Sequence, residues 1–269
     1  MFNNARQKLL TFIVTITLSF GAHADNLIKL ATTTSTENSG LLKEILPRFH
    51  EKSGYKVHVI AVGTGKALRM GRDGDVDVVL VHARSAEDQF IAEGHGDKRY
   101  DVMYNDFVIV GPADDPAGIT NAANIGQVMN KIADSKSLFV SRGDDSGTHK
   151  KEKQLWQAAG VTTSGDWYRE AGQGMGKVLQ MASELEAYTM ADRGTWLAYE
   201  NKVASKLLFA GDKILFNPYG IIAINQTKYP DLNHKGAQAF IDWIISAEGQ
   251  QQISDFKVNG KQLFIPDAK

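Results

Sequence analysis

Short apolar runs alternate along the chain with longer stretches in which apolar residues recur at helical spacing. Helical spacing is clear in two stretches, at Leu41, Leu42, Ile45, Leu46 and Phe49 and at Phe240, Ile241, Ile244 and Ile245. The apolar runs predict strands at Leu27 to Ala31, Val57 to Val62, Val76 to Val81, Asp106 to Val110, Leu138 to Val140, Ala187 to Met190, Leu207 to Phe209 and Gly220 to Ile224. This alternation predicts βαβ units, parallel sheets and the α/β class.

Two of the predicted strands run directly into turns that are rich in hydrogen-bond donors. One turn is Thr32-Thr33-Thr34-Ser35, and the other, from Ser141 to Thr148, carries Arg142 and a Ser-Gly-Thr sequence before a polar helix. Unpaired N–H groups at a helix start carry the positive end of the helix dipole, and hydroxyls and a guanidinium add donors. Ligands of open α/β sheets bind beyond the carboxyl ends of the strands. The pattern therefore predicts a clamp on a small oxyanion.

A third turn, Gly63-Thr64-Gly65, follows the strand that ends at Val62. It is not a P-loop, because that motif needs glycine at Ile60 and a hydroxyl residue at Ala67, and it is not a dinucleotide fingerprint, because Leu68 stands at the third glycine position. A simple tight turn is the alternative to a ligand contact. The glycines between 172 and 176 also fail the dinucleotide pattern.

The first 24 residues have the pattern of a secretory signal peptide. Arg6 and Lys8 precede an apolar run from Leu9 to Phe20, and Ala22-His23-Ala24 provides a small-residue cleavage site. The run is shorter than the roughly 20 apolar residues that a spanning helix needs. We therefore expect a mature chain that begins at Asp25 and works in the periplasm.

Composition narrows the class of protein and its partners. Removal of the leader takes away two basic residues and no acidic one, which leaves 28 basic and 31 acidic residues. This balance gives no indication of nucleic acid or an anionic membrane as a partner. The sequence has no cysteine, which excludes disulfides, thiolate metal sites and a lipidated cysteine. A hydrophobic content of 43% supports an ordinary globular core, in one large domain or two lobes.

Nearly the whole mature sequence resembles the tungstate-binding receptors of ABC uptake systems. The strings that carry the resemblance are Thr32 to Ser35, Val62 to Leu68, Asp77 to Ala83, Asn105 to Pro112, Ser141 to Glu152 and Tyr188 to Trp196. The Thr-Thr-Thr-Ser and Ser-Arg-Gly-Asp-Asp-Ser-Gly-Thr-His strings are specific as a pair. The resemblance implies a two-lobed periplasmic-binding-protein fold of type II, in which the chain crosses twice between the lobes.

Two β-rich segments of similar length are candidates for the crossings. Asn105 to Gly111 and Asn217 to Ile224 are flanked by glycine and proline, and we expect them to run side by side as a hinge. Residues 25–109 and 217–269 would then form lobe one, and residues 110–216 would form lobe two. Closure of the lobes about such a hinge would bury the ligand.

The expected ligand contacts come from turns on both lobes. They are Thr33, Thr34, Ser35, Thr64, Arg142, Ser146, Gly147 and Thr148. Arg142 supplies the only cationic side chain that we place in contact, because its planar fork suits pairs of oxygen atoms. The alternatives are plain helix capping for the hydroxyl residues and a surface or interlobe ion pair for Arg142. No cofactor and no metal cation are expected.

Several other polar residues are more simply structural. We expect Asp145 to start a helix, since a carboxylate beside a dianion site would repel the ligand. Asp144 or Asp145, turned inward as an acceptor, would instead favour phosphate. His82, His95 and His149 lack the spacing of metal ligands, and Lys66 is expected on a solvated helix face.

Arg193 begins another predicted helix and is a candidate cleft or supporting residue. Trp156, Trp167, Trp196 and Trp243 stand among apolar residues and are expected in the core.

The sequence and the resemblance together predict a periplasmic receptor that captures tungstate, with molybdate as a second candidate, for an inner-membrane ABC permease. A monomer without enzymatic activity is expected. A phosphate or sulfate receptor of the same fold is the nearest alternative. A secreted phosphoester hydrolase, with Ser146 or Thr34 as nucleophile, is the alternative of another class, but it needs a general base or a metal within reach. A ligand-sensing module on a membrane receptor would share the fold.

Overall fold

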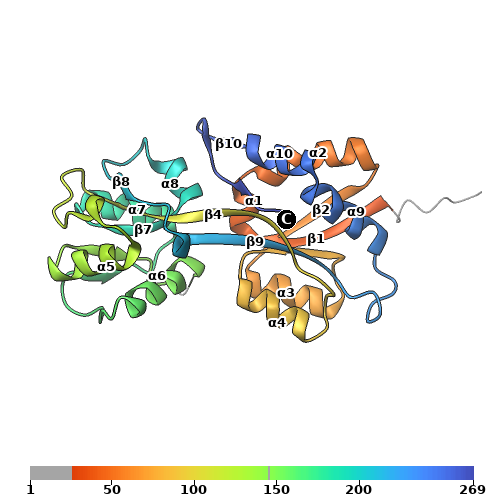
Figure 1. Ribbon diagram of the computed structural model, residues 1–269, viewed down its shortest axis with the longest axis horizontal. Helices are drawn as coiled ribbons and strands as arrows, with labels where there is room; N and C mark the ends of the chain where they lie inside the picture. The colour runs from red at the N-terminus through yellow and green to blue at the C-terminus, as the bar shows by residue number, and fades with distance from the viewer. Residues whose placement is uncertain (1–25, 145) are drawn as a thin grey trace, which may run out of the picture.

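The computed structural model describes residues 26–144 and 146–269. The predicted signal peptide at residues 1–24 and the predicted helix start at Asp145 both lie outside the described residues. No helix among the described residues is long and apolar enough to span a membrane. The elements gather into two lobes joined by a pair of long strands (Figure 1).

Lobe one is built on a mixed sheet in the order β12-β4-β9-β3-β1-β2. The strands are β1 (Leu27–Thr33), β2 (Lys56–Val62), β3 (Val78–Val81), β4 (Tyr100–Gly111), β9 (Phe216–Ala223) and β12 (Ile265–Pro266). β1 pairs in parallel with β2 and β3, as the βαβ pattern predicts. The pairs β3 with β9, β9 with β4 and β4 with β12 are antiparallel, so this sheet is mixed and the predicted parallel pairing holds in it only for β1 with its two neighbours. The reason is that β9 returns from the other lobe rather than from a crossover helix.

Side chains alternate between the two faces of the sheet along each strand of lobe one, so each face packs against a different set of helices. Ile28 and Leu30 of β1 belong to the core cluster that contains residues of α2 (Leu41–Ser53) and α9 (His234–Ile245). Ala31 of β1 belongs instead to the cluster under α3 (Thr64–Asp73) and α4 (Arg84–Ala92). Figure 1 shows α3 and α4 on one side of the sheet and α2, α9 and α10 (Ala247–Asp255) on the other. The sheet is therefore buried between two helical layers.

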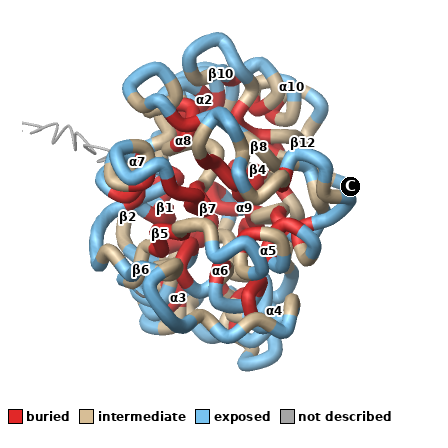
Figure 2. The backbone as a smooth tube through the Cα atoms, turned by 90° about the vertical axis from the view of Figure 1, so that its left-hand side faces the viewer, coloured by how far each residue is buried: buried red, intermediate tan, exposed pale blue. Residues whose placement is uncertain are grey.

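Lobe two repeats this arrangement on a smaller scale. Its strands are β5 (Phe139–Ser141), β6 (Tyr168–Glu170), β7 (Thr189–Asp192) and β8 (Lys206–Phe209), and its helices are α5 (Ile125–Asp134), α6 (Gly147–Ala158), α7 (Met175–Glu184) and α8 (Arg193–Tyr199). Short 3-10 helices span Ile119–Asn121 and Lys213–Leu215. A separate core cluster centres on Phe139, Trp156 and Tyr188. Figure 2, seen along the long axis, places the buried segments inside a mostly exposed outer layer.

The strands β4 and β9 carry the chain between the lobes. Within β4, Tyr100–Asp106 pairs with β9, whereas Phe107–Gly111 pairs with β7 and β8. The two predicted crossing segments meet where Asn105 pairs with Asn217. The pairing is antiparallel, so the two segments run in opposite directions from this point. The residues of β4 after Asp106 continue into lobe two and leave β9.

Each predicted strand overlaps an observed one, with ends displaced by a few residues. The unpredicted strands are very short: β6, the hairpin of β10 (Lys257–Val258) with β11 (Lys261–Gln262), and β12. A short α1 (Thr34–Asn38) also precedes α2. Of the four tryptophans expected in the core, Trp156, Trp196 and Trp243 are buried and Trp167 is half-buried.

Gly249 tests how tightly α10 joins α9. A Cβ at this position would meet the backbone of Trp243 and would lie 2.7 Å from Cα of Ile244, and neither atom can turn aside. We expect Gly249→Ala to lower the free energy of unfolding by about 1–3 kcal/mol in urea titrations. Gly65→Ala is the control, because its Cβ would meet only the flexible Arg69 side chain at 3.7 Å. Equal stability of the two variants would contradict the close packing of Gly249.

Candidate functional site

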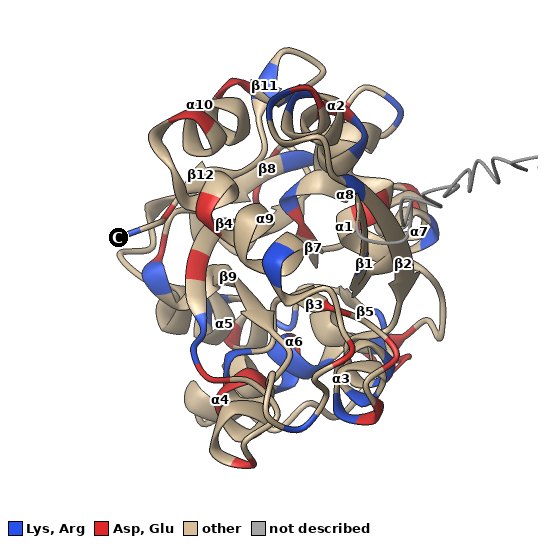
Figure 3. Ribbon diagram, turned by 90° about the vertical axis from the view of Figure 1, so that its right-hand side faces the viewer, with Lys and Arg blue, Asp and Glu red and all other residues tan. Residues whose placement is uncertain are grey.

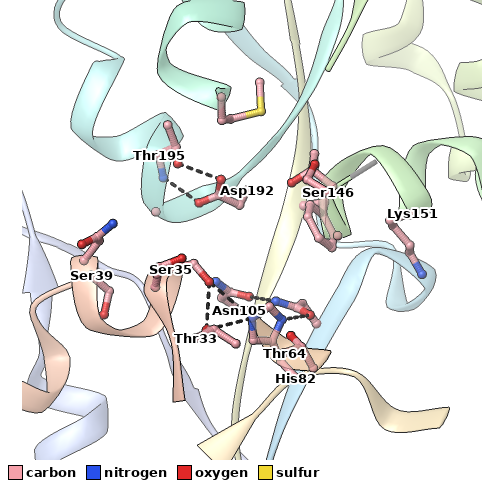
Figure 4. A pocket seen from close by; sticks show the side chains of 18 of the residues that line it. Thr33, Ser35, Ser39, Thr64, His82, Asn105, Ser146, Lys151, Asp192 and Thr195 are labelled. Carbon is pink, nitrogen blue, oxygen red and sulfur yellow. Dashed lines mark hydrogen bonds between the residues drawn. The ribbon is translucent and has the colours of Figure 1, made fainter. Parts of the chain in front are cut away.

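A cavity of about 1180 Å³ lies between the lobes. All eight predicted ligand residues line it: Thr33, Thr34, Ser35 and Thr64 from lobe one and Arg142, Ser146, Gly147 and Thr148 from lobe two. Figure 4 shows Thr33, Ser35 and Thr64 on one side of the cavity and Ser146 across from them. The fold thus brings residues from separate turns to a single place.

Helix starts from both lobes converge on this cavity. The first turns of α1, α3, α6, α7 and α8 all contribute to its lining. The N-cap residues Thr33, Ser146 and Asp192 each accept a hydrogen bond from the first turn of their own helix. The N-caps of α3 and α7, Gly63 and Gly174, supply no side-chain cap. Lys66 and Lys177 donate their N–H groups to the carbonyls of these glycines, so the first two N–H groups of α3 and of α7 remain for an anion, which the helix dipoles favour.

The turn after β1 presents two hydroxyls that share a ring nitrogen. Oγ1 of Thr33 lies 3.0 Å from Oγ of Ser35 and 3.1 Å from Nε2 of His82, and Oγ of Ser35 lies 3.3 Å from the same nitrogen. Thr33 is buried, and Thr34 and Ser35 are exposed. Oγ1 of Thr33 also accepts from the N–H of Thr36, so capping and ligand contact are compatible for this residue.

His82 is held from behind by the two crossing strands. Nδ1 lies 3.1 Å from Oδ1 of Asn217 in β9, and Nδ2 of Asn217 donates to Oδ1 of Asn105 in β4 at 2.9 Å. Because Oδ1 of Asn217 accepts, Nδ1 of His82 carries the proton and Nε2 is the acceptor. The ring stacks on Tyr219 with a centroid distance of 4.6 Å. Burial lowers the pKa of His82 and outweighs the opposing effects of Asn217 and Asp192, so the ring is neutral.

Arg142 reaches the cavity from the turn after β5. Its Nη2 donates to Oδ2 of Asp144, whereas Nε is buried and has no hydrogen-bond partner within residues 26–144 and 146–269. Burial raises the pKa of Asp144, but hydrogen bonds from Ser146 and Arg142 outweigh it, so the pKa lies below its usual value. Arg142 thus pairs with Asp144 of its own turn in lobe two, and among the described residues one guanidinium donor has no acceptor.

The remaining predicted residues stand at helix starts. Ser146 caps α6, Gly147 is exposed at its first position, and Thr148 is buried in its first turn. Thr64 is half-buried at the first position of α3. These positions place backbone N–H groups and hydroxyls together.

Neither Lys66 nor Arg193 lines the cavity. Lys66 is exposed, as expected. Arg193 forms a bidentate ion pair with Asp106, which fastens α8 to β4 near the crossing. Arg193 therefore supports the hinge rather than the cavity wall.

Sequence reasoning missed several lining residues, among them His82, Asn105, Asp192, Thr195, Asn217 and Gly176. The rule that ligands meet the carboxyl ends of strands would have found three of them, because His82 follows β3, Asp192 is the last residue of β7 and Thr195 lies just beyond it. Asp192 is an acceptor in the wall, but its two oxygens accept from N–H and Oγ1 of Thr195 at 2.8 and 2.7 Å. The asparagines carry no local signal, since only their cross-strand pairing brings them to the site.

Glu152 supports the Arg142 turn from inside lobe two. It accepts from Oγ of Ser141 at 2.9 Å, Nε1 of Trp156 at 3.1 Å and the hydroxyl of Tyr168 at 2.8 Å, and it is 1% exposed. Burial raises the pKa of Glu152, and these three donors oppose that rise. The carboxyl group therefore ties the base of the turn to α6 and β6.

Within the part of the chain that the structure describes, no cluster of three or more His, Cys, Asp or Glu could hold a metal cation. The site instead offers hydroxyls, backbone N–H groups and a guanidinium. Two lobes on paired crossing strands, with donors facing across the cleft, define a binding protein for a small anion.

Comparisons with known proteins give the family. Residues 21–248 match the model of a PBP superfamily domain. The tungstate-binding protein TupA of Peptoclostridium acidaminophilum is 49% identical over 245 residues, which cover 90% of this chain and 86% of that protein. The chain belongs to the PBP superfamily and, within it, to the same family as this TupA protein.

Solved structures of relatives have the same fold. The tungstate-binding protein TupA from Desulfovibrio alaskensis G20 is 45% identical with a TM-score of 0.88, over 90% of this chain and 99% of that one. The structure described as the tungstate ABC transporter from Geobacter sulfurreducens is 53% identical with a TM-score of 0.75, over 86% of this chain and 99% of that one.

Loss of the Glu152 carboxylate should destabilise lobe two. Glu152→Ala leaves the buried donors of Ser141, Trp156 and Tyr168 without their acceptor, so we expect the free energy of unfolding to fall by about 2–4 kcal/mol. Denaturant titration measures the change. Lys153→Ala, at the next and exposed position of α6, is the matched control. A Glu152→Ala protein as stable as this control would show that the carboxylate is dispensable.

Proposed function

We propose that this protein is the periplasmic receptor of an ABC uptake system and that it captures tungstate, with molybdate as a second ligand. The observation that carries the proposal is the meeting of donors from two lobes at one cavity, where Nε of Arg142 lacks an acceptor among the described residues. The relatives whose names specify tungstate support the identity of the anion. The receptor works as a monomer, without a cofactor, and delivers the ion unchanged to the permease.

The available donors are sufficient for tight binding without a metal cation. A micromolar to nanomolar complex requires roughly 8–12 kcal/mol. A hydrogen bond to a charged group contributes about 1.5–3 kcal/mol. Hydroxyls of Thr33, Ser35 and Thr148, the guanidinium of Arg142 and the open N–H groups of α3 together exceed six donors. The free energy from that many hydrogen bonds is enough to offset the free-energy costs of closing the lobes and desolvating the ion.

Closure of the lobes completes the site. The cavity of about 1180 Å³ exceeds the roughly 300–1,000 Å³ of ordinary ligand pockets, so donors on its two walls must approach to surround a single ion. In our proposal residues 25–109 with 217–269 move as one body and residues 110–216 as the other, about β4 and β9. Arg142 keeps its contact with Asp144 and presents its remaining N–H groups to the oxyanion.

The donor set favours anions that only accept hydrogen bonds. Tungstate, molybdate and sulfate are such dianions, whereas phosphate carries a proton for much of the time near neutral pH. The proton of phosphate needs an acceptor, but Asp144 does not line the cavity and both oxygens of Asp192, which does, are held by Thr195. Sulfate is disfavoured by size, because its shorter bonds leave its oxygens beyond reach of several donors at once. A phosphate or sulfate receptor remains the nearest alternative.

A hydrolase is the second candidate because of one arrangement of residues. Ser35, His82 and Asn217 stand in the order of nucleophile, base and orienting group, with 3.3 Å between Oγ and Nε2 and 3.1 Å between Nδ1 and Oδ1. Thr33 lies closer to the same Nε2, so the ring nitrogen is shared between two hydroxyls. We propose binding rather than catalysis, and assays of the pure protein with nitrophenyl esters and phosphates should give no turnover above background.

Arg142 should contribute the largest single side-chain contact to the ion. We expect Arg142→Ala to weaken tungstate binding by about 2–4 kcal/mol, because a charge-assisted contact in a desolvated cleft is lost. Arg142→Lys should recover only part of the affinity, since a point charge replaces a planar fork. Calorimetric titration measures both, with Arg169→Ala, an exposed arginine outside the cavity, as control. Parental affinity in Arg142→Ala would place the site elsewhere.

Competition titrations should rank the anions by proton content and size. Molybdate should bind within about tenfold of tungstate, whereas phosphate should be weaker by roughly 5- to 150-fold, the cost of one unpaired donor. Sulfate should also bind more weakly than either metallate. Phosphate or sulfate binding as tight as tungstate would overturn the metallate assignment and leave an oxyanion receptor of the same fold.

A further inference from the structure

The hydroxyls of Thr33 and Ser35 share one acceptor, the ring of His82, and Oγ1 of Thr33 also lies 2.6 Å from Oγ1 of Thr36. Both oxygens lie within 3.3 Å of Nε2 of His82, which is the acceptor nitrogen of the ring. Because Nε2 needs a donor, at least one of the two hydroxyls donates its proton to the ring, beside which Figure 4 shows both side chains. The ring cannot turn to release it, because Asn217 holds Nδ1 and Tyr219 stacks on the face.

An acceptor-only dianion conflicts with this arrangement. To bind it, Thr33 and Ser35 must both turn their protons toward the ion, since a hydroxyl has only one proton to donate. Nε2 would then face two oxygen atoms with no proton between them. A buried acceptor without a donor is unfavourable, and the electron pairs of the three atoms would repel one another. A proton on Nε2 removes the conflict, because both hydroxyl oxygens can accept from it while they donate to the ion.

We propose that His82 takes up a proton from solvent when the oxyanion binds, so that an imidazolium behind the β1 turn acts through Thr33 and Ser35 on the ion. The inference rests on the proposed function, because it requires an acceptor-only dianion in this cavity. His82 is a positioning residue in this proposal, because it acts through the two hydroxyls that it contacts. The protein gains one positive charge in lobe one, opposite Arg142 in lobe two, and no covalent bond changes.

The charges around His82 permit this uptake. The carboxylate of Asp192, at the start of α8, favours the protonated ring. Tyr219 of β9 stays neutral, because burial raises the pKa of its hydroxyl well above the usual value. Arg84 on α4 is paired with Asp88, and Arg142 across the cavity is paired with Asp144. Burial keeps His82 neutral without the ligand, and two negative charges placed against the hydroxyls reverse that balance.

Proton uptake makes binding depend on pH in a defined direction. In this proposal His82 has a lower pKa in the free protein than in the complex, so the affinity for tungstate is highest at pH values below the pKa of the free protein. Between the pKa of the free protein and that of the complex, the affinity falls as pH rises, by up to about tenfold per pH unit. Above the higher value the affinity levels off, at that of the neutral ring.

The experiment is calorimetric titration of sodium tungstate into the full mature protein between about pH 6 and 8, in two buffers with different heats of ionisation. The difference in apparent heat gives the number of protons taken up per ion bound. The His82→Gln variant places an amide where the imidazole Nε2 lay, and an amide cannot take up a proton. His58→Gln, an exposed histidine on β2, is the matched control. Nitrogen-15 spectra of the imidazoles, recorded with and without tungstate, follow His82 directly.

We expect net proton uptake in the parent and in His58→Gln, little or none in His82→Gln, and an imidazolium spectrum for His82 only in the complex. Tungstate binding without proton uptake by the parent overturns the inference alone. Uptake that is undiminished in a folded His82→Gln protein overturns it as well, since the proton then resides elsewhere. If His82→Gln fails to fold, the spectra of the parent decide. Absence of tungstate binding overturns the proposed function and this inference with it.

Discussion

The antiparallel pairing of β4 with β9 is the constraint on which the rest of the structure depends. β4 belongs to both sheets, since its first half pairs with β9 and its second half with β7 and β8. The cavity forms where the lobes separate around these strands. The same strands supply Asn105 and Asn217, which orient the ring behind the β1 turn. The crossing strands and the site therefore share residues.

The helix starts that lack a side-chain cap are the ones that can donate backbone hydrogen bonds to an anion in this cleft. Thr33, Ser146 and Asp192 satisfy their own helices, whereas the glycines before α3 and α7 leave donors exposed. Glycine at an N-cap costs only a few tenths of a kcal/mol relative to a capping side chain. A modest local loss thus gives the cleft backbone donors that carry no charge. Figure 3 shows Lys and Arg interspersed with Asp and Glu over the helices, in keeping with a nearly neutral chain.

Support for the site comes from buried polar groups whose partners are complete. Glu152 receives three donors beneath the Arg142 turn, and the Arg193–Asp106 pair fastens α8 beside the crossing. Buried polar networks of this kind stabilise a particular arrangement only when each member is satisfied. Nε of Arg142 departs from that rule at the cavity, where a ligand oxygen would satisfy it.

The sequence by itself determined the α/β class, most of the strands and the donor-rich turns, because hydrophobic period and turn chemistry are local properties. The turns at Thr33 and Arg142 could be identified because hydroxyls, glycine and arginine after a strand carry their chemistry in a few adjacent residues. Only the tertiary structure decided the mixed direction of the sheet and the roles of His82, Asn105 and Asn217. Those roles depend on cross-strand register between residues more than one hundred positions apart, which no local pattern records. The pairing of Arg142 with Asp144 was likewise decided by side-chain geometry, since the sequence equally allowed either acid to turn inward.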